Sequence, residues 1–85
     1  MDKEGGWQDR LSEEASKVNL INCKREFLRR VRLHKDRNMP RNMSISAARK
    51  EVMAEFRKKY SSIKNFEVVY ILYELQRELE REKLI

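Results

Sequence analysis

The chain has 85 residues, a formal net charge of +6 from 20 Lys and Arg against 14 Asp and Glu, and only two Gly and one Pro. This length allows one domain, and so few turn-forming residues exclude a sheet protein with many turns. Cys23 is the single cysteine, which excludes an internal disulfide. No apolar run is long enough to cross a bilayer, so we expect a cytoplasmic protein in a reducing compartment.

The positive charge is concentrated in the middle of the chain. Residues 23–64 carry fourteen basic and four acidic groups, whereas residues 1–22 and residues 65–85 each carry three basic and five acidic groups. A basic centre of this kind favours an anionic partner. The opposing interpretation is that these charges are only the solvated surface of a small soluble protein.

Residues 1–10 are predicted to form a flexible segment. This segment contains Trp7, which either anchors it against the domain or is an exposed contact residue. The anchor is favoured because a large aromatic side chain gains from partial burial. Helical spacing begins at Leu11, and a first helix is predicted over about residues 11–36, with Asn19 as a candidate interruption.

The clearest part of this first helix starts at Leu20 and is amphipathic. A core-facing stripe falls within a narrow arc at about 100° per residue and consists of Leu20, Cys23, Phe27, Val31 and His34. The opposite side carries Arg25, Arg29 and Arg32 at spacings of four and three. The helix is therefore predicted to have one apolar face and one basic face.

Pro40 separates the first helix from the second. Because proline restricts the residue before it, the first helix is predicted to end by Asn38. Ser44 is then a suitable N-cap for a second helix over about residues 45–60, and Ser46 is the alternative cap.

A third helix is predicted over about residues 65–83, with Asn65 as its cap. Its stretch from Phe66 to Leu79 has no Gly or Pro and includes six consecutive apolar residues, Val68 to Tyr73. Such a helix needs cover from more than one neighbour, so we expect the chain to be organised around it. A strand over these residues is rejected because the chain has no second strand-like run to pair with it.

The predicted fold is therefore all-α: a small three-helix bundle over residues 11–85, with an extra short N-terminal helix as an option. Spacings of four, three and four in the third helix form the seam of a short coiled coil, made of Val68, Leu72, Leu75 and Leu79. This seam predicts a homodimer interface. The same spacing also serves ordinary packing within one bundle, and that alternative stays open.

Nothing in the sequence indicates catalysis, a cofactor or a metal site. Cys23 and His34 are eleven residues apart, about three turns along one predicted helix, so they cannot form a catalytic pair. His34 also has no second histidine or cysteine at ligand spacing. We therefore expect a protein that is not an enzyme, with both residues at the edge of the core.

The basic centre is the strongest functional signal. If the first two long helices are antiparallel, their cations form one surface about 20 to 25 Å long. The residues predicted to contact nucleic acid are Arg25, Arg29, Arg30, Arg32, Lys35, Arg37, Arg41, Arg49, Lys50, Arg57 and Lys58. Such a surface suits phosphate contacts more than base readout, and the sequence does not separate DNA from RNA.

A nucleic-acid-binding protein, dimeric through its third helix, is thus the leading hypothesis. A helix-turn-helix fits poorly because the third helix is apolar and then acidic. The alternative hypothesis is a helical interaction or assembly subunit whose basic face binds an acidic protein. A membrane partner ranks lowest, because the apolar stripe of the first long helix is needed to cover the third helix.

Overall fold

The computed structural model describes residues 6–85, which contain helices and connections but no strand. A 3-10 helix, Gln8–Arg10, precedes α1 (Glu13–Ser16), α2 (Leu20–Asp36), α3 (Arg41–Lys59) and α4 (Asn65–Arg81). The all-α fold is confirmed, and α1 is the extra short helix. Half of the predicted flexible segment, residues 1–10, lies outside the described residues, and its described half contains the 3-10 helix.

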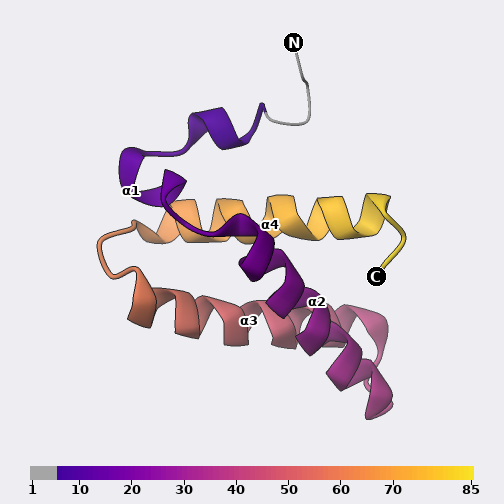
Figure 1. Cartoon of the computed structure of the whole chain (residues 1–85). Helices are drawn as coiled ribbons and strands as arrows, with labels where there is room; N and C mark the ends of the chain where they lie inside the picture. Colours follow the sequence, from indigo (N-terminus) through magenta and orange to yellow (C-terminus); the bar gives the residue numbers. More distant parts are fainter. Residues whose placement is uncertain (1–5) are drawn as a thin grey trace.

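The three long helices pack in two layers. α3 and α4 run antiparallel side by side, α2 crosses them on one side, and α1 lies near the start of α4 (Figure 1). The Cα atoms extend over 39 × 32 × 18 Å, so the molecule is flat, as two layers of helices require.

The predicted first helix is divided in two. α1 ends at Ser16, and Asn19 then adopts an extended backbone with φ −79° and ψ 94°. The side-chain oxygen of Asn19 accepts a hydrogen bond from the backbone nitrogen of Asn22 at 3.1 Å, which caps α2. Asn19 therefore interrupts the helix, because its side chain competes for backbone hydrogen bonds and favours the N-cap position.

α3 begins at Arg41, four residues before the predicted start. Pro40 is its N-cap, and the φ of −58° that the proline ring fixes is compatible with entry into a helix. The prediction that Ser44 caps this helix is wrong. Ser44 is fully buried inside α3, where its hydroxyl donates to the backbone oxygen of Met39 at 3.2 Å.

The other helix ends lie close to the predicted ones. α2 ends at Asp36, and Asn38 then takes a left-handed backbone with φ 65°, which Asn tolerates better than most residues. Asn65 is the first residue of α4 and not its cap, since the N-cap position is held by Lys64. α4 ends at Arg81.

One side of α4 is the centre of the core. Its apolar side chains are at most 1% exposed, and they are Val68, Ile71, Leu72, Leu75 and Leu79. Phe27 and Val31 of α2 and Ala48 of α3 belong to the same buried cluster. The chain is thus organised around its third long helix, as the sequence predicts.

The four residues predicted to form a dimer seam are used within one chain. Val68, Leu72, Leu75 and Leu79 are covered by the helices of the same chain, so none of them is free to line an interface with a second copy. The assignment of a dimer interface to these residues is therefore corrected. Their spacing reflects packing inside a single bundle, the alternative that the sequence left open.

The apolar stripe of α2 also faces the core. Phe27 and Val31 are fully buried, and Leu20, Cys23 and His34 lie partly buried beside them. This stripe is therefore not free to lie on a membrane in the folded protein. Within residues 6–85, no helix has both the length and the apolar composition that crossing a bilayer requires.

Replacing Ile71 with alanine is expected to lower the free energy of unfolding by about 2 to 5 kcal/mol, because it leaves a cavity in the core. Urea titration followed by circular dichroism measures this change. The matched control is Ile21→Ala in α2, where the isoleucine is 71% exposed, and it should stay within about 0.5 kcal/mol of the wild type. Equal effects of the two substitutions would contradict the assignment of the core.

Candidate nucleic-acid interface

The side of α2 that points away from the core carries a row of arginines. The core side chains Phe27 and Val31 fix the rotation of the helix, and at about 100° per residue the arginines fall opposite them. We call this row, with the exposed cations at the end of the helix, the outer face of α2; it consists of Arg25, Arg29, Arg32, Lys35 and Arg37. All five residues are exposed to solvent.

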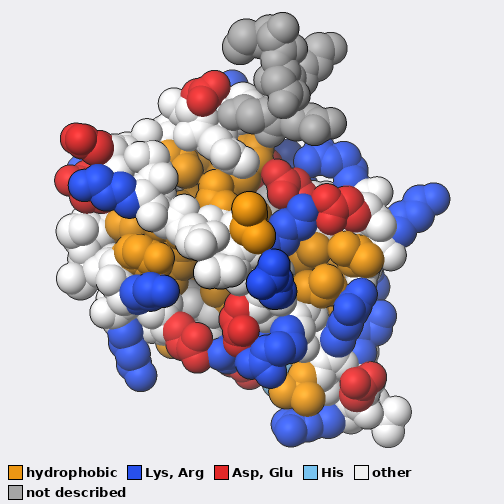
Figure 2. Space-filling model, in the orientation of Figure 1, with side chains coloured by type: hydrophobic (Ala, Val, Ile, Leu, Met, Phe, Trp, Pro, Cys, Tyr) orange, Lys and Arg blue, Asp and Glu red, His pale blue; other side chains and the backbone are white. Residues whose placement is uncertain are grey.

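Charges of both signs share the side of the molecule on which α2 lies. Figure 2 shows this side, because α2 crosses in front of α3 in the same view, and basic side chains are interspersed there with acidic and apolar ones. This side of the molecule is therefore basic only in places. Where it is basic depends on which cations are already paired with carboxylates.

Arg30 belongs to the seam between α2 and α3 and not to the outer face. Its side chain is 16% exposed, and its guanidinium pairs with Glu26 at 2.7 Å, with Glu51 at 3.3 Å and with Glu55. His34 reaches the same seam, where its Nε2 lies 2.8 Å from a carboxylate oxygen of Glu51. Arg30 therefore joins the two helices and is not free to contact an external phosphate.

Glu26 also binds one arginine of the outer face. Arg29 donates two hydrogen bonds to its carboxylate, from Nε at 3.2 Å and from Nη2 at 2.7 Å. Hydrogen bonds from Arg29 and then Arg30 lower the pKa of Glu26 from 4.5 to about 2. Glu26 is thus ionised at neutral pH and offsets part of the positive charge of the outer face.

Most cations of α3 do not join the outer face of α2. α3 presents Glu51 and Glu55 to Arg30, and Lys50 and Arg57 lie about 100 to 160° around the helix from these carboxylates. Lys50 and Arg57 therefore lie on the side of α3 that faces away from α2. Lys58 is exposed near the C-terminal end of the helix.

Two further cations of α3 face α4. Arg41 Nη2 lies 3.3 Å from Glu80 Oε2. Arg49 donates to Gln76 Oε1 at 2.9 Å, and its guanidinium lies 4.5 Å from the centroid of the Tyr73 ring. The expectation of one continuous basic surface is therefore wrong, because the packing of each helix turns its cations toward different sides of the molecule.

The segment from Trp7 to Ser12 is held against α4 by polar contacts. Trp7 Nε1 donates to Glu78 Oε2 at 3.0 Å, and the Trp7 ring packs edge-on against Tyr70 with 5.9 Å between centroids. Ser12 donates to Glu67 from its backbone nitrogen at 2.8 Å and from its hydroxyl at 2.9 Å. Trp7 is therefore an anchor, as favoured from the sequence.

The sequence interpretation missed an exposed apolar stripe on α4. Phe66, Val69 and Tyr73 are 69%, 36% and 45% exposed, although they begin the helix that forms the centre of the core. Their spacing of three and four places them on one side of the helix. This spacing is the sequence signal for the stripe. It is difficult to recognise because Val68 to Tyr73 are all apolar, so the exposed and the buried side of the helix look alike in the sequence.

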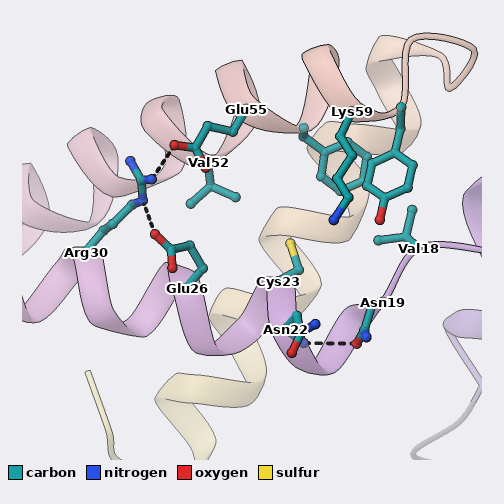
Figure 3. Close-up of a pocket in the computed structure, with 11 residues that line it drawn as sticks. Val18, Asn19, Asn22, Cys23, Glu26, Arg30, Val52, Glu55 and Lys59 are labelled. Carbon is teal, nitrogen blue, oxygen red and sulfur yellow. Dashed lines mark hydrogen bonds and ion pairs between the residues drawn. The ribbon is translucent and has the colours of Figure 1, made fainter.

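A cleft of about 460 Å³ lies between the start of α2 and the end of α3 (Figure 3). Its apolar lining comes from Val18, Val52, Phe56 and Tyr60. The sulfur of Cys23 points into the space between the two helices, while Glu26 and Glu55 both turn toward Arg30. Burial raises the pKa of the Cys23 thiol to about 11, so it is protonated at neutral pH and is a poor nucleophile.

The described residues 6–85 contain no group of three or more His, Cys, Asp or Glu side chains arranged to hold a metal ion. Comparison with family models, with curated proteins and with solved structures found no match to this chain. Its function is therefore inferred from its own geometry.

Glu26→Gln is expected to lower the free energy of unfolding at neutral pH, because it removes the carboxylate that Arg29 and Arg30 bind. The pKa of Glu26 is lower in the folded than in the unfolded chain, so its stabilisation is present above pH 4.5 and is lost as the pH falls toward 2. Urea titrations over this range should show the difference from the wild type shrinking. A difference that is constant with pH would contradict this account. The control is Glu74→Gln, since Glu74 makes no ion pair with residues 6–85.

Cys23 is expected to react slowly with iodoacetamide in the folded protein. Raising the thiol pKa from 9.0 to about 11 lowers the thiolate fraction at mildly alkaline pH by about a hundredfold. Alkylation rates of the native and urea-unfolded chain, followed by mass spectrometry, measure this protection. Equal rates in the two states would show that the thiol is not protected in the fold.

Proposed function

We propose that this chain is a nucleic-acid-binding protein that places the outer face of α2 against the phosphate backbone. The observation that carries the proposal is the row Arg25, Arg29 and Arg32 on the exposed side of one helix. Lys35 and Arg37 add two exposed cations at the C-terminal end of that helix, outside the row. From Arg25 to Lys35 these cations span about 15 Å along α2. Duplex DNA offers one phosphate charge per roughly 1.7 Å of axis, so several phosphates lie within reach of this row.

The pairing of the cations supports this choice of face. Arg25, Arg32, Lys35 and Arg37 make no ion pair with any described residue, whereas Arg29 shares its charge with Glu26. A phosphate can therefore bind these four cations without displacing an internal carboxylate. Arg25 and Arg32 have the planar guanidinium that suits two-point contact with phosphate oxygens.

The proposed contacts are made to phosphates and therefore read shape more than base sequence. DNA and RNA both offer such contacts, and the choice between them is left to experiment. All of the cations come from one chain, so the proposal does not depend on a dimer. α4 is not proposed as a recognition helix, because its apolar side is buried and its C-terminal half carries Glu74, Glu78 and Glu80.

The test is binding to random-sequence duplex DNA, duplex RNA and single strands, measured by fluorescence anisotropy over a series of salt concentrations. The variant Arg25→Ala, Arg32→Ala, Lys35→Ala should weaken binding and reduce the slope of log affinity against log salt by about one for each phosphate that the variant no longer neutralises. It leaves the contacts between Glu26, Arg29 and Arg30 intact, so the helical circular dichroism signal should be unchanged.

The matched control removes three exposed charges that lie outside the outer face of α2, two from α3 and one from α4: Lys50→Ala, Arg57→Ala, Arg77→Ala. This control has the same net charge as the outer-face variant, and it should keep the wild-type affinity and salt slope. Equal weakening in the two variants would show that only net charge matters. Wild-type binding by the outer-face variant would rule out the proposed interface.

A further inference from the structure

One apolar side of α4 stays partly exposed to solvent in the described part of the chain. We call Phe66, Val69 and Tyr73 the aromatic stripe of α4; they are 69%, 36% and 45% exposed. At about 100° per residue the stripe lies on the opposite side of the helix from the buried Ile71 and Leu75. It therefore faces away from α2, on the other side of the flat molecule.

Cations of α3 lie beside this stripe. Arg41 pairs with Glu80 and Arg49 with Gln76, which fixes the register of the two antiparallel helices. In that register Arg57 comes level with Phe66. Arg49 already lies over the ring of Tyr73, with 4.5 Å between the guanidinium carbon and the ring centroid.

The carboxylates of α4 are mostly committed elsewhere. Glu67 accepts hydrogen bonds from Ser12, and Glu78 accepts from Trp7, both on the opposite side of the helix from the aromatic stripe. Glu80 lies at the far end of the stripe and is paired with Arg41. Glu74, next to Tyr73, is the one unpaired carboxylate beside the stripe among the described residues. Four cations outnumber it there, and they are Arg49, Lys50, Arg57 and Arg77.

We propose that the aromatic stripe of α4, with the cations of α3 beside it, is a docking site for an acidic amphipathic helix of a partner protein. Apolar residues of that helix would pack on Phe66, Val69 and Tyr73, and its carboxylates would meet the arginines that border the stripe. The spacing of the stripe is the spacing by which one helix packs on another. The cations that border the stripe are complementary to carboxylates, and for this reason the proposed partner is acidic.

Two other occupants fit this surface less well. A second copy of the chain, related by a two-fold axis, would bring Arg49 and Arg57 against like charges, which opposes association. A single-stranded nucleic acid needs rings on which successive bases stack. The rings of Phe66 and Tyr73 are seven residues apart, about 10 Å along the helix, with an aliphatic side chain between them.

The docking site is separate from the proposed nucleic-acid interface. It uses none of the residues of the outer face of α2, and it lies on the other side of the molecule. Either proposal can therefore fail while the other stands.

The test is isothermal titration calorimetry with a synthetic amphipathic peptide of about 18 residues that has leucines at i, i+3, i+4 and i+7 and glutamates on its polar side. A companion peptide has lysine in place of each glutamate. The acidic peptide should bind at least about tenfold more tightly than the basic one. In nitrogen-15 NMR spectra, the amide signals that shift should belong to residues 49–57 and 66–77.

The variant Phe66→Ala, Tyr73→Ala should weaken binding of the acidic peptide by about tenfold or more, because it removes the two largest contact side chains. The matched control is Ile21→Ala, Leu33→Ala, which removes exposed apolar side chains from α2 and should leave the affinity unchanged. Both variants alter exposed residues, so the circular dichroism spectrum should remain that of the wild type.

Three outcomes would overturn the proposal. The first is no binding of the acidic peptide up to about 1 mM, or equal binding of the two peptides. The second is a concentration-dependent dimer, seen by light scattering, that the variant Phe66→Ala, Tyr73→Ala abolishes, which would assign the stripe to a second copy. The third is a loss of single-strand binding in that variant with peptide binding intact, which would assign the stripe to nucleic acid.

Discussion

Burial of one side of α4 is the constraint on which the rest of the fold depends. Five of its apolar side chains, from Val68 to Leu79, are almost completely removed from water, and in 85 residues only the other helices can cover them. α3 covers this side from one direction, and α2 must cross both helices to close it. Once Phe27 and Val31 are committed to that contact, Arg25, Arg29 and Arg32 on the opposite side of α2 can only point outward. The core therefore determines which charges a partner can meet.

Polar contacts then fix how the helices sit on that core. Burial of a carboxylate is costly without hydrogen bonds, and Glu67 receives two of them from Ser12. The same contact holds the short α1 on α4, which a single turn of helix could not achieve by itself. On the other side, Arg30 brings carboxylates of α2 and α3 together. The positive charge of Arg30 is therefore used to hold two helices together. From the composition alone, this charge would be counted as available to bind a partner.

The elements of this fold could be predicted from the sequence, but the relation between them could not. Apolar periodicity indicates the three long helices. Asn19 marks the start of α2 and Pro40 the break between α2 and α3, because the effects of both residues on the backbone are local. Ser44 was wrongly predicted as a helix cap, because serine favours caps but is also small enough to be buried inside a helix bundle. The candidate site was only partly predictable. Whether Arg30 faces solvent or α3 depends on helix rotation, which is set by packing between segments far apart in the sequence.

The flatness of the molecule has an electrostatic consequence. The outer face of α2 and the aromatic stripe of α4 lie on opposite sides of a molecule whose smallest Cα extent is 18 Å. At physiological ionic strength the Debye length is about 8 Å, so charges on one side are largely screened from those on the other. An anion bound to one side would therefore have little effect on the affinity of the opposite side for a second anion. On the two proposals, the nucleic acid and the acidic helix would bind this chain at the same time, each with little electrostatic effect on the other.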